Sequence, residues 1–283
     1  MWTVGEIARS LAACALVSLT GVVAAQTPAE TGEDAAVGES INYVFATDLG
    51  SGLYDLDGRT LQIYRFTYRR DLRAADAQRF GARFVLPVTA GFFDFNPIDV
   101  LSEGPPTRVD SIGVMPGFEL EYRLRNDWRL IPYLRAGASV ASSSVDGLLY
   151  GVGARLERHG DFHGWDQFLR EELSFAAVDY RHGVPSDRFV RLRHAVEIRR
   201  RLGLRARGHE FDLGLYGILD AVLDPPTIPF AGAREAPFQM EVGFTLGTRP
   251  PVKLWRFDAP RIGLGFRSVG RINAWRITIG VPF

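Results

Sequence analysis

The sequence predicts an all-β fold, a transmembrane antiparallel up-and-down β-barrel of about 12 strands that follows a cleaved N-terminal signal peptide. Three observations predict it. An apolar segment with the features of an export signal opens the chain, polar and apolar residues then alternate from about residue 41 to the last residue, and aromatic residues recur near the ends of the alternating runs. A period of two is typical of strands with two unlike faces.

The first segment of the chain has the pattern of a secretory signal peptide. LAACALVSLTGVV is its apolar core, and small residues before Gln26 offer a cleavage site. A buried helix is the alternative interpretation of this stretch. The residues that follow are acidic and small, which favours a mobile tail. We therefore expect a signal peptide at 1–25, a flexible periplasmic tail at 26–40 and the outer-membrane β-barrel at 41–283.

Alternation is clearest in three runs. In GFELEYRLR at 117–125, aromatic and leucine side chains occupy one face, and glutamates and arginines occupy the other. FVRLRHAVEIR at 189–199 and FQMEVGFTLG at 238–247 repeat this pattern, with His194 as an exception on an apolar face. The same reasoning predicts strands near 42–54, 59–70, 80–94, 112–125, 128–141, 147–158, 166–180, 188–200, 210–222, 237–248, 260–268 and 273–283.

The connections favour a barrel in the bacterial outer membrane. With the N-terminus in the periplasm, the long loops at 95–111 and 223–236 fall outside the cell, and the short turn at 126–127 falls inside. The periplasmic link at 249–259 is long for this scheme. A secreted soluble β protein is the alternative, but aromatic residues near strand ends are typical of girdles in contact with membrane lipid. They are Tyr43, Tyr54, Phe92, Phe93, Trp128, Trp165, Tyr180, Trp255 and Trp275.

The chain ends on the strand-like run AWRITIGVPF. A closed barrel leaves no free edge, because its last strand pairs with its first. The terminal aromatic also resembles the C-terminal signal of outer-membrane proteins, and this resemblance implies the barrel-assembly machinery as a partner. The residues of this candidate assembly signal are Trp275, Ile277, Ile279, Val281 and Phe283.

Four longer runs carry a family resemblance. LGSGLYDLDGRTLQIYRFTY at 49–68, FVLPVTAGFFDF at 84–95, VMPGFELEYRLRNDWRLIPYLRAG at 114–137 and LGFRSVGRINAWRITIGVPF at 264–283 resemble the solitary outer-membrane autotransporter-like β-barrel family. The resemblance implies a barrel like an autotransporter translocator, here without a passenger domain, because only about fifteen residues separate the signal peptide from the first strand. It implies no particular activity or substrate.

The inward face is where function is expected. Either Arg and Glu pair across the lumen and rigidify it, which the cost of unpaired charges favours, or the excess of Arg makes a narrow diffusion channel for a small anionic solute. A third interpretation is a structural or adhesive surface protein that acts through its extracellular loops. Alternation predicts a lumen lined by Arg65, Arg69, Glu119, Glu121, Arg123, Arg125, Arg129, Arg135, Arg155, Glu157, Arg191, Arg193, Glu197, Arg199 and Glu241.

Other classes of function lack their motifs. The formal net charge is zero and no nucleic-acid motif appears, so we expect no nucleic-acid partner. We expect no enzyme, because no arrangement of Ser142, His182 or other residues fixes a catalytic triad. His159 and His163 lack matched metal ligands, and Cys14 lies in the predicted signal peptide, so we expect neither a metal nor another cofactor.

Overall fold

The described part of the protein is a closed β-barrel within the compact unit Val37–Phe283. The predicted signal peptide at 1–25 and tail at 26–40 lie outside the described residues, as do most of the loops at 95–111 and 223–236. The computed structural model describes residues 51–56, 59–76, 79–93, 111–125, 127–141, 147–180, 186–223, 227–228, 233–234, 238–250, 252–254, 257–258, 261–269 and 272–283.

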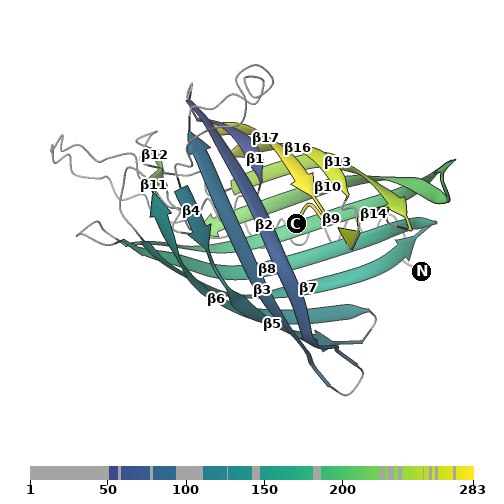
Figure 1. Ribbon diagram of the computed structural model, residues 1–283, viewed down its shortest axis with the longest axis horizontal. Helices are drawn as coiled ribbons and strands as arrows, with labels where there is room; N and C mark the ends of the chain where they lie inside the picture. Colours follow the sequence, from purple (N-terminus) through teal and green to yellow (C-terminus); the bar gives the residue numbers. More distant parts are fainter. Residues whose placement is uncertain are drawn as a thin grey trace, which may run out of the picture. The chain divides into compact units, whose positions relative to one another are not determined.

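The barrel wall is one sheet of thirteen strands (Figure 1). Two further sheets are two-stranded hairpins, β11 (Thr227–Ile228) with β12 (Ala233–Arg234), and β14 (Lys253–Leu254) with β15 (Phe257–Asp258). The wall strands are β1 (Gly52–Leu56), β2 (Arg59–Arg73), β3 (Gly81–Phe93), β4 (Ser111–Val114), β5 (Gly117–Arg123), β6 (Trp128–Ala141), β7 (Gly147–Phe162), β8 (Trp165–Tyr180), β9 (Asp187–Ala206), β10 (His209–Leu223), β13 (Phe238–Arg249), β16 (Ile262–Val269) and β17 (Ile272–Ile279).

The wall has twelve spans, because β4 and β5 are two pieces of one strand between β3 and β6. The break lies at Met115 and Pro116. Across it, the Met115 amide donates to the Pro87 carbonyl at 3.1 Å and the Pro116 carbonyl accepts from the Ala136 amide at 3.0 Å. The strand prediction for 112–125 therefore differs from the observed strand by this interruption and by one or two residues at each end, since the two pieces run from Ser111 to Arg123.

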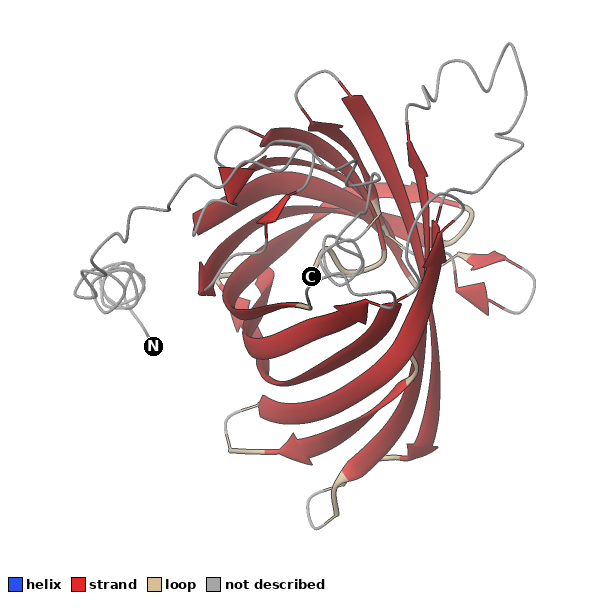
Figure 2. Cartoon of the chain, turned by 90° about the vertical axis from the view of Figure 1, so that its left-hand side faces the viewer, coloured by secondary structure: helices blue, strands red, loops and turns tan. Residues whose placement is uncertain are grey.

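The barrel closes between its first and last strands. β1 pairs antiparallel with β17, with Leu53 opposite Trp275, and β2 pairs with both β1 and β3. All neighbouring wall strands are antiparallel, so the ring of backbone hydrogen bonds has no free edge among the described strands (Figure 2). Closure satisfies the backbone polar groups that lipid cannot hydrogen-bond. The predicted up-and-down barrel is confirmed.

The two faces of the wall have opposite polarity. Large apolar side chains project outward and stay uncovered, as with Phe66 at 68% and Leu134 at 61% exposure. Carboxylates and guanidinium groups project inward, and Glu197 and Glu241 are at most 1% exposed. An exposed apolar surface on this scale is unfavourable in water and favourable in a bilayer. The described part of the chain holds no helix with the length and hydropathy that crossing a membrane requires.

Some predicted strand ends differ from the observed ones. β7 and β9 extend past 158 and 200 to Phe162 and Ala206, because they lead directly into tight turns. The last strand ends at Ile279 and does not continue to 283. Gly280 has φ +99°, a conformation that favours glycine, and its amide donates to the Arg261 carbonyl at 2.7 Å. The last residues therefore leave the barrel wall.

Candidate functional site: the barrel lumen

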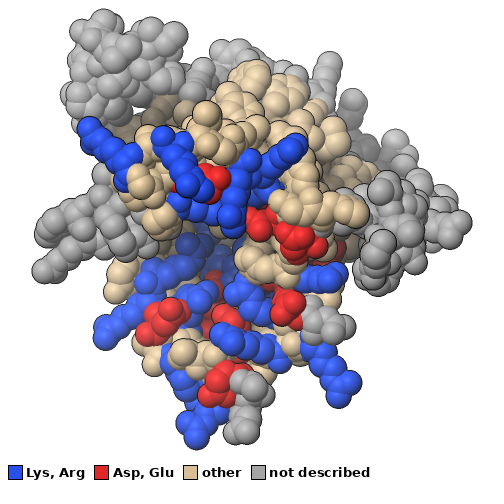
Figure 3. Space-filling model, turned by 90° about the vertical axis from the view of Figure 1, so that its right-hand side faces the viewer, with Lys and Arg blue, Asp and Glu red and all other residues tan. Residues whose placement is uncertain are grey.

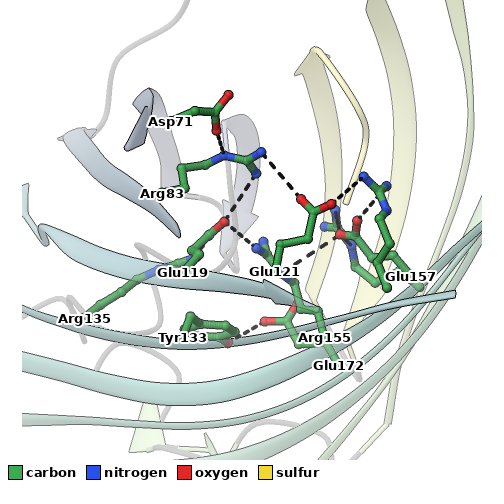
Figure 4. Close-up of polar contacts among 11 residues, drawn as sticks. Asp71, Arg83, Glu119, Glu121, Tyr133, Arg135, Arg155, Glu157 and Glu172 are labelled. Carbon is green, nitrogen blue, oxygen red and sulfur yellow. Dashed lines mark hydrogen bonds and ion pairs between the residues drawn. The ribbon is translucent and has the colours of Figure 1, made fainter. Parts of the chain in front are cut away.

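One group of inward charges gathers on β3, β5, β6, β7 and β8 (Figure 4). Glu119 is 2.7 Å from Arg155, 3.1 Å from Arg135 and 3.7 Å from Arg83. Arg155 also reaches Glu157 at 4.0 Å. Glu119 and Arg155 therefore each face more than one opposite charge, and the wall on this side is held by a continuous ionic network.

The same group extends to the next carboxylates along the wall. Glu157 accepts from Arg170 at 2.7 Å and from Arg129 at 3.2 Å. Glu172 accepts a 2.6 Å hydrogen bond from the Tyr133 hydroxyl. A buried carboxylate needs such donors, because desolvation without them costs several kcal/mol.

A second group of charges lies on β9, β10, β13, β16 and β17. Arg193 donates two hydrogen bonds to Asp220, at 2.7 and 2.8 Å, and Arg267 donates a third at 2.8 Å. Arg276 lies 2.9 Å from Glu241. Bidentate guanidinium–carboxylate pairs are both strong and geometrically specific, so these contacts fix the register of neighbouring side chains.

Nearer the end with the short turns, Asp212 and Glu197 continue this second group. Arg249 lies 2.7 Å from Asp212, and Arg261 also pairs with it. Glu197 lies 2.5 Å from Arg199. All inward carboxylates named so far have at least one cationic or hydroxyl donor.

Two tyrosine rings fill space beside inward glycines. Tyr216 donates to Glu241 at 2.8 Å, and its hydroxyl lies 2.0 Å from where a Cβ on Gly265 would stand. Tyr133 likewise lies 2.6 Å from a Cβ placed on Gly153. Only glycine leaves room for these rings, so Gly153 and Gly265 accommodate the two tyrosine side chains.

The C-terminal residues pack inside the barrel. Phe283 stacks on Phe168, with ring centroids 5.4 Å apart, and contacts the buried cluster of Ala195, Tyr216 and Ile218. The C-terminus lies within the ring of strands in Figure 2. This short segment narrows the lumen beside the charged groups.

Arg65 and Arg69 on β2 differ from the other lumen arginines. Within the described residues, neither has a carboxylate oxygen within 4.0 Å of its guanidinium, whereas Arg83, Arg135 and Arg155 each have one. The charges that act on Arg65 include Arg69 and Arg135, which repel it, and Glu172, which attracts it. Positive charge is therefore in excess on this part of the inner wall.

Basic side chains also surround the end of the barrel that carries the short turns (Figure 3). The exposed arginines at this end include Arg73, Arg79, Arg123, Arg125, Arg205 and Arg207. Salt screens the field of such exposed charges over about 8–10 Å.

The predicted lumen residues fall into three sets. The first set is Arg65 and Arg69, which lie inside the wall without an ion pair to another described residue. The second set is Arg123 and Arg125, which are exposed at the short-turn end. Arg123 reaches Glu121 there at 3.9 Å. The structure brings the following into ion pairs: Glu119, Glu121, Arg129, Arg135, Arg155, Glu157, Arg191, Arg193, Glu197, Arg199 and Glu241.

The residues of the candidate assembly signal separate at Gly280. Trp275 and Ile277 project to the outer surface, Val281 is exposed beyond the strand, and Phe283 turns inward. The side chain of Ile279 lies outside the described ones. Recognition of this segment by an assembly machinery stays a prediction.

Sequence reasoning missed several partners in the network. Asp212, Tyr216 and Asp220 share the inward face of β10, and the alternation within 210–222 is the signal that could have found them. Glu172 and Arg170 on β8 follow the same rule. Acidic residues on β10 are what balance Arg193, Arg249, Arg261 and Arg267.

A closed antiparallel ring, an even number of spans, an apolar outer surface and a charged lumen together define an outer-membrane β-barrel. No family model matches the sequence, and no curated protein matches it. Among solved structures, the chain is similar to the beta domain of the Bordetella autotransporter BrkA, with 14% identity over 80% of this chain and 92% of that one, and a TM-score of 0.49. It is also similar to the KdgM porin in complex with disordered oligogalacturonate, with 9% identity over 80% of this chain and 95% of that one, and a TM-score of 0.40.

The assignment of an apolar outer face and a charged inner face rests on the burial of the side chains. The closure of the ring rests on the pairing of the strands.

Proposed function

We propose that the chain is a translocator-like outer-membrane barrel whose lumen is a polar path, kept narrow at rest by ion pairs across its inner wall. The observation that carries this proposal is the sharing of buried carboxylates between several arginines, above all Glu119 among Arg83, Arg135 and Arg155. A lumen serving only stability could be filled with apolar side chains, which often stabilise as well as a buried ion pair.

A charged lumen differs from an apolar lumen in how its side chains interact with water when the path opens. Arginines and carboxylates that separate can each be hydrated, so a wall of this kind can pass from a closed to a water-filled state. An apolar plug has no such hydrated alternative. The two groups of ion pairs therefore suit a path that opens for a substrate, whose identity is left unassigned.

Conductance of the purified barrel in a planar bilayer tests this proposal. We expect a small, fluctuating conductance for the natural chain and a larger one for Glu119→Gln, because three arginines then lose a shared partner and repel one another. Asp71→Asn is the matched control, since Asp71 binds Arg83 at the exposed end of the network. A natural chain and a Glu119→Gln variant that both never conduct would contradict the proposal.

A narrow channel for anionic solutes is a second candidate, and one observation favours it. Arg65 and Arg69 lack a carboxylate partner among the described residues, and Arg65 has Arg135 as a like-charged neighbour. Uncompensated arginines facing a water-filled path select for anions.

The reversal potential across a salt gradient tests the anion channel. We expect a preference for chloride over potassium that falls in Arg65→Gln and is unchanged in Arg125→Gln, because Arg125 lies exposed in a turn. A cation-selective natural chain would reject this candidate and leave the first proposal standing.

A further inference from the structure

The chain leaves the barrel wall at Gly280 and crosses the lumen. β17 ends at Ile279, whereas Phe283 stacks on Phe168 of β8. The strands of the wall follow one another in the order β17, β16, β13, β10, β9 and β8, so β8 lies five strands from β17 in a ring of twelve spans. Residues 280–283, which we call the crossing segment, therefore pass from one side of the barrel nearly to the opposite side (Figure 2).

The crossing segment enters from the end of the barrel that carries the short turns. Ile279, the last residue of β17, pairs with Ile262, the first residue of β16. Ile262 pairs in turn with the end of β13, and the end of β13 pairs with the start of β10, which follows a tight turn. Phe283 reaches further in, to Ala195 and Ile218 near the middle of β9 and β10. The segment therefore lies across the path that leads inward from the short-turn opening.

Both groups of lumen ion pairs contact the crossing segment. Arg276, which lies 2.9 Å from Glu241 in the second group, also donates a hydrogen bond to the Pro282 carbonyl. Arg170, a member of the first group, has its guanidinium carbon 5.5 Å from the centre of the Phe283 ring, and a cation in this position is attracted to the face of the ring. The charges that line the lumen therefore also hold the segment that crosses it.

The crossing segment is attached to the barrel in a way that permits movement. Gly280 has φ +99°, a conformation in which glycine is unstrained, so the backbone turns at this residue. None of the described strands pairs with the segment, Val281 is 46% exposed, and Phe283 is only partly buried. Displacing residues 280–283 would break a ring stack and single hydrogen bonds but no ladder between strands. Residues at the end of an element commonly absorb the backbone change in such hinged motions.

We propose that residues 280–283 are an internal gate of the lumen. With Phe283 stacked on Phe168, the apolar rings close the space between the two charged groups, because an apolar constriction excludes water and ions. When the ring leaves this position, the segment turns about Gly280 and the path opens. This inference rests on the proposed polar path and adds to it the part that moves. The ion pairs narrow the lumen, and the aromatic ring closes what remains.

Removing the ring after the barrel has folded tests this proposal. Cys14 is the only cysteine, so Cys14→Ala with Phe283→Cys leaves one thiol, to which benzyl methanethiosulfonate attaches a benzyl group through a disulfide. The full chain is refolded in detergent with this ring in place, checked by heat-modifiable migration and inserted into a planar bilayer. Dithiothreitol then removes the benzyl group. We expect the low-conductance state to be lost on reduction. After the dithiothreitol is washed out, benzyl methanethiosulfonate should restore that state and methyl methanethiosulfonate should not.

Val281→Cys, treated in the same way, is the matched control, because the Val281 side chain is exposed beyond the strand. Glu119→Gln reports on the ion pairs separately. A larger conductance for Glu119→Gln, with no change when Phe283→Cys loses its benzyl group, would overturn the gate and leave the polar path standing. An equal rise for Val281→Cys, a benzyl group that dithiothreitol in the bath cannot remove, or closure by the methyl reagent would also overturn the gate. If none of these proteins conducts, the gate and the polar path are both wrong.

Discussion

Asp220 is the residue whose loss should weaken the lumen network most. It is 1% exposed and accepts two hydrogen bonds from Arg193 and one from Arg267. Asp220→Asn keeps the shape of the side chain and removes its charge, so two buried guanidinium groups lose their counter-ion. Breaking a buried pair in this way costs about 3–5 kcal/mol. We expect Asp220→Asn to lower the free energy of unfolding by an amount in this range.

The assay is equilibrium unfolding by urea in lipid vesicles, followed by tryptophan fluorescence and by heat-modifiable migration. The control is Asp71→Asn, because Asp71 binds Arg83 at 2.6 Å but its side chain is 68% exposed. Exposed pairs contribute about 1 kcal/mol or less. Combining Asp220→Asn with Arg193→Met should restore part of the loss, because one uncompensated charge is removed as well. If Asp220→Asn and Asp71→Asn cost the same, lumen water solvates the arginines and the reasoning fails.

Two further predictions concern the inner and outer faces. Gly265→Ala should cost about 1–3 kcal/mol and weaken the Tyr216–Glu241 hydrogen bond, because its Cβ would lie 2.0 Å from the Tyr216 hydroxyl, whereas Gly160→Ala meets no atom within 4 Å and should leave urea unfolding unchanged. Leu134→Arg, at an outward position 61% exposed near the middle of β6, should lower the free energy of unfolding in vesicles by about 2–4 kcal/mol. An equally stable Leu134→Arg protein would show that this face does not contact lipid.

The sequence carries enough information for the strands and their faces. Side chains of successive strand residues point to opposite sides, so a run such as 117–123 sorts its residues between two faces without any knowledge of its neighbours. Alternation did not predict the break at Met115 and Pro116, because the backbone hydrogen bonds that hold this break come from β3 and β6. Alternation also predicted a last strand that continues beyond Ile279, because the pattern alone does not reveal the turn at Gly280.

Alternation in the sequence by itself determined that this protein is built of strands with one charged and one apolar face. The tertiary structure decided which polar groups meet: Arg193 with Asp220, 27 residues apart, and the Thr245 hydroxyl with Glu197, 48 residues apart. It also decided that Phe283 packs inward and that Glu171 and His194 meet on the outer wall. The physical reason is that such contacts depend on strand register and on the curvature of the closed ring, which join residues that no local pattern connects.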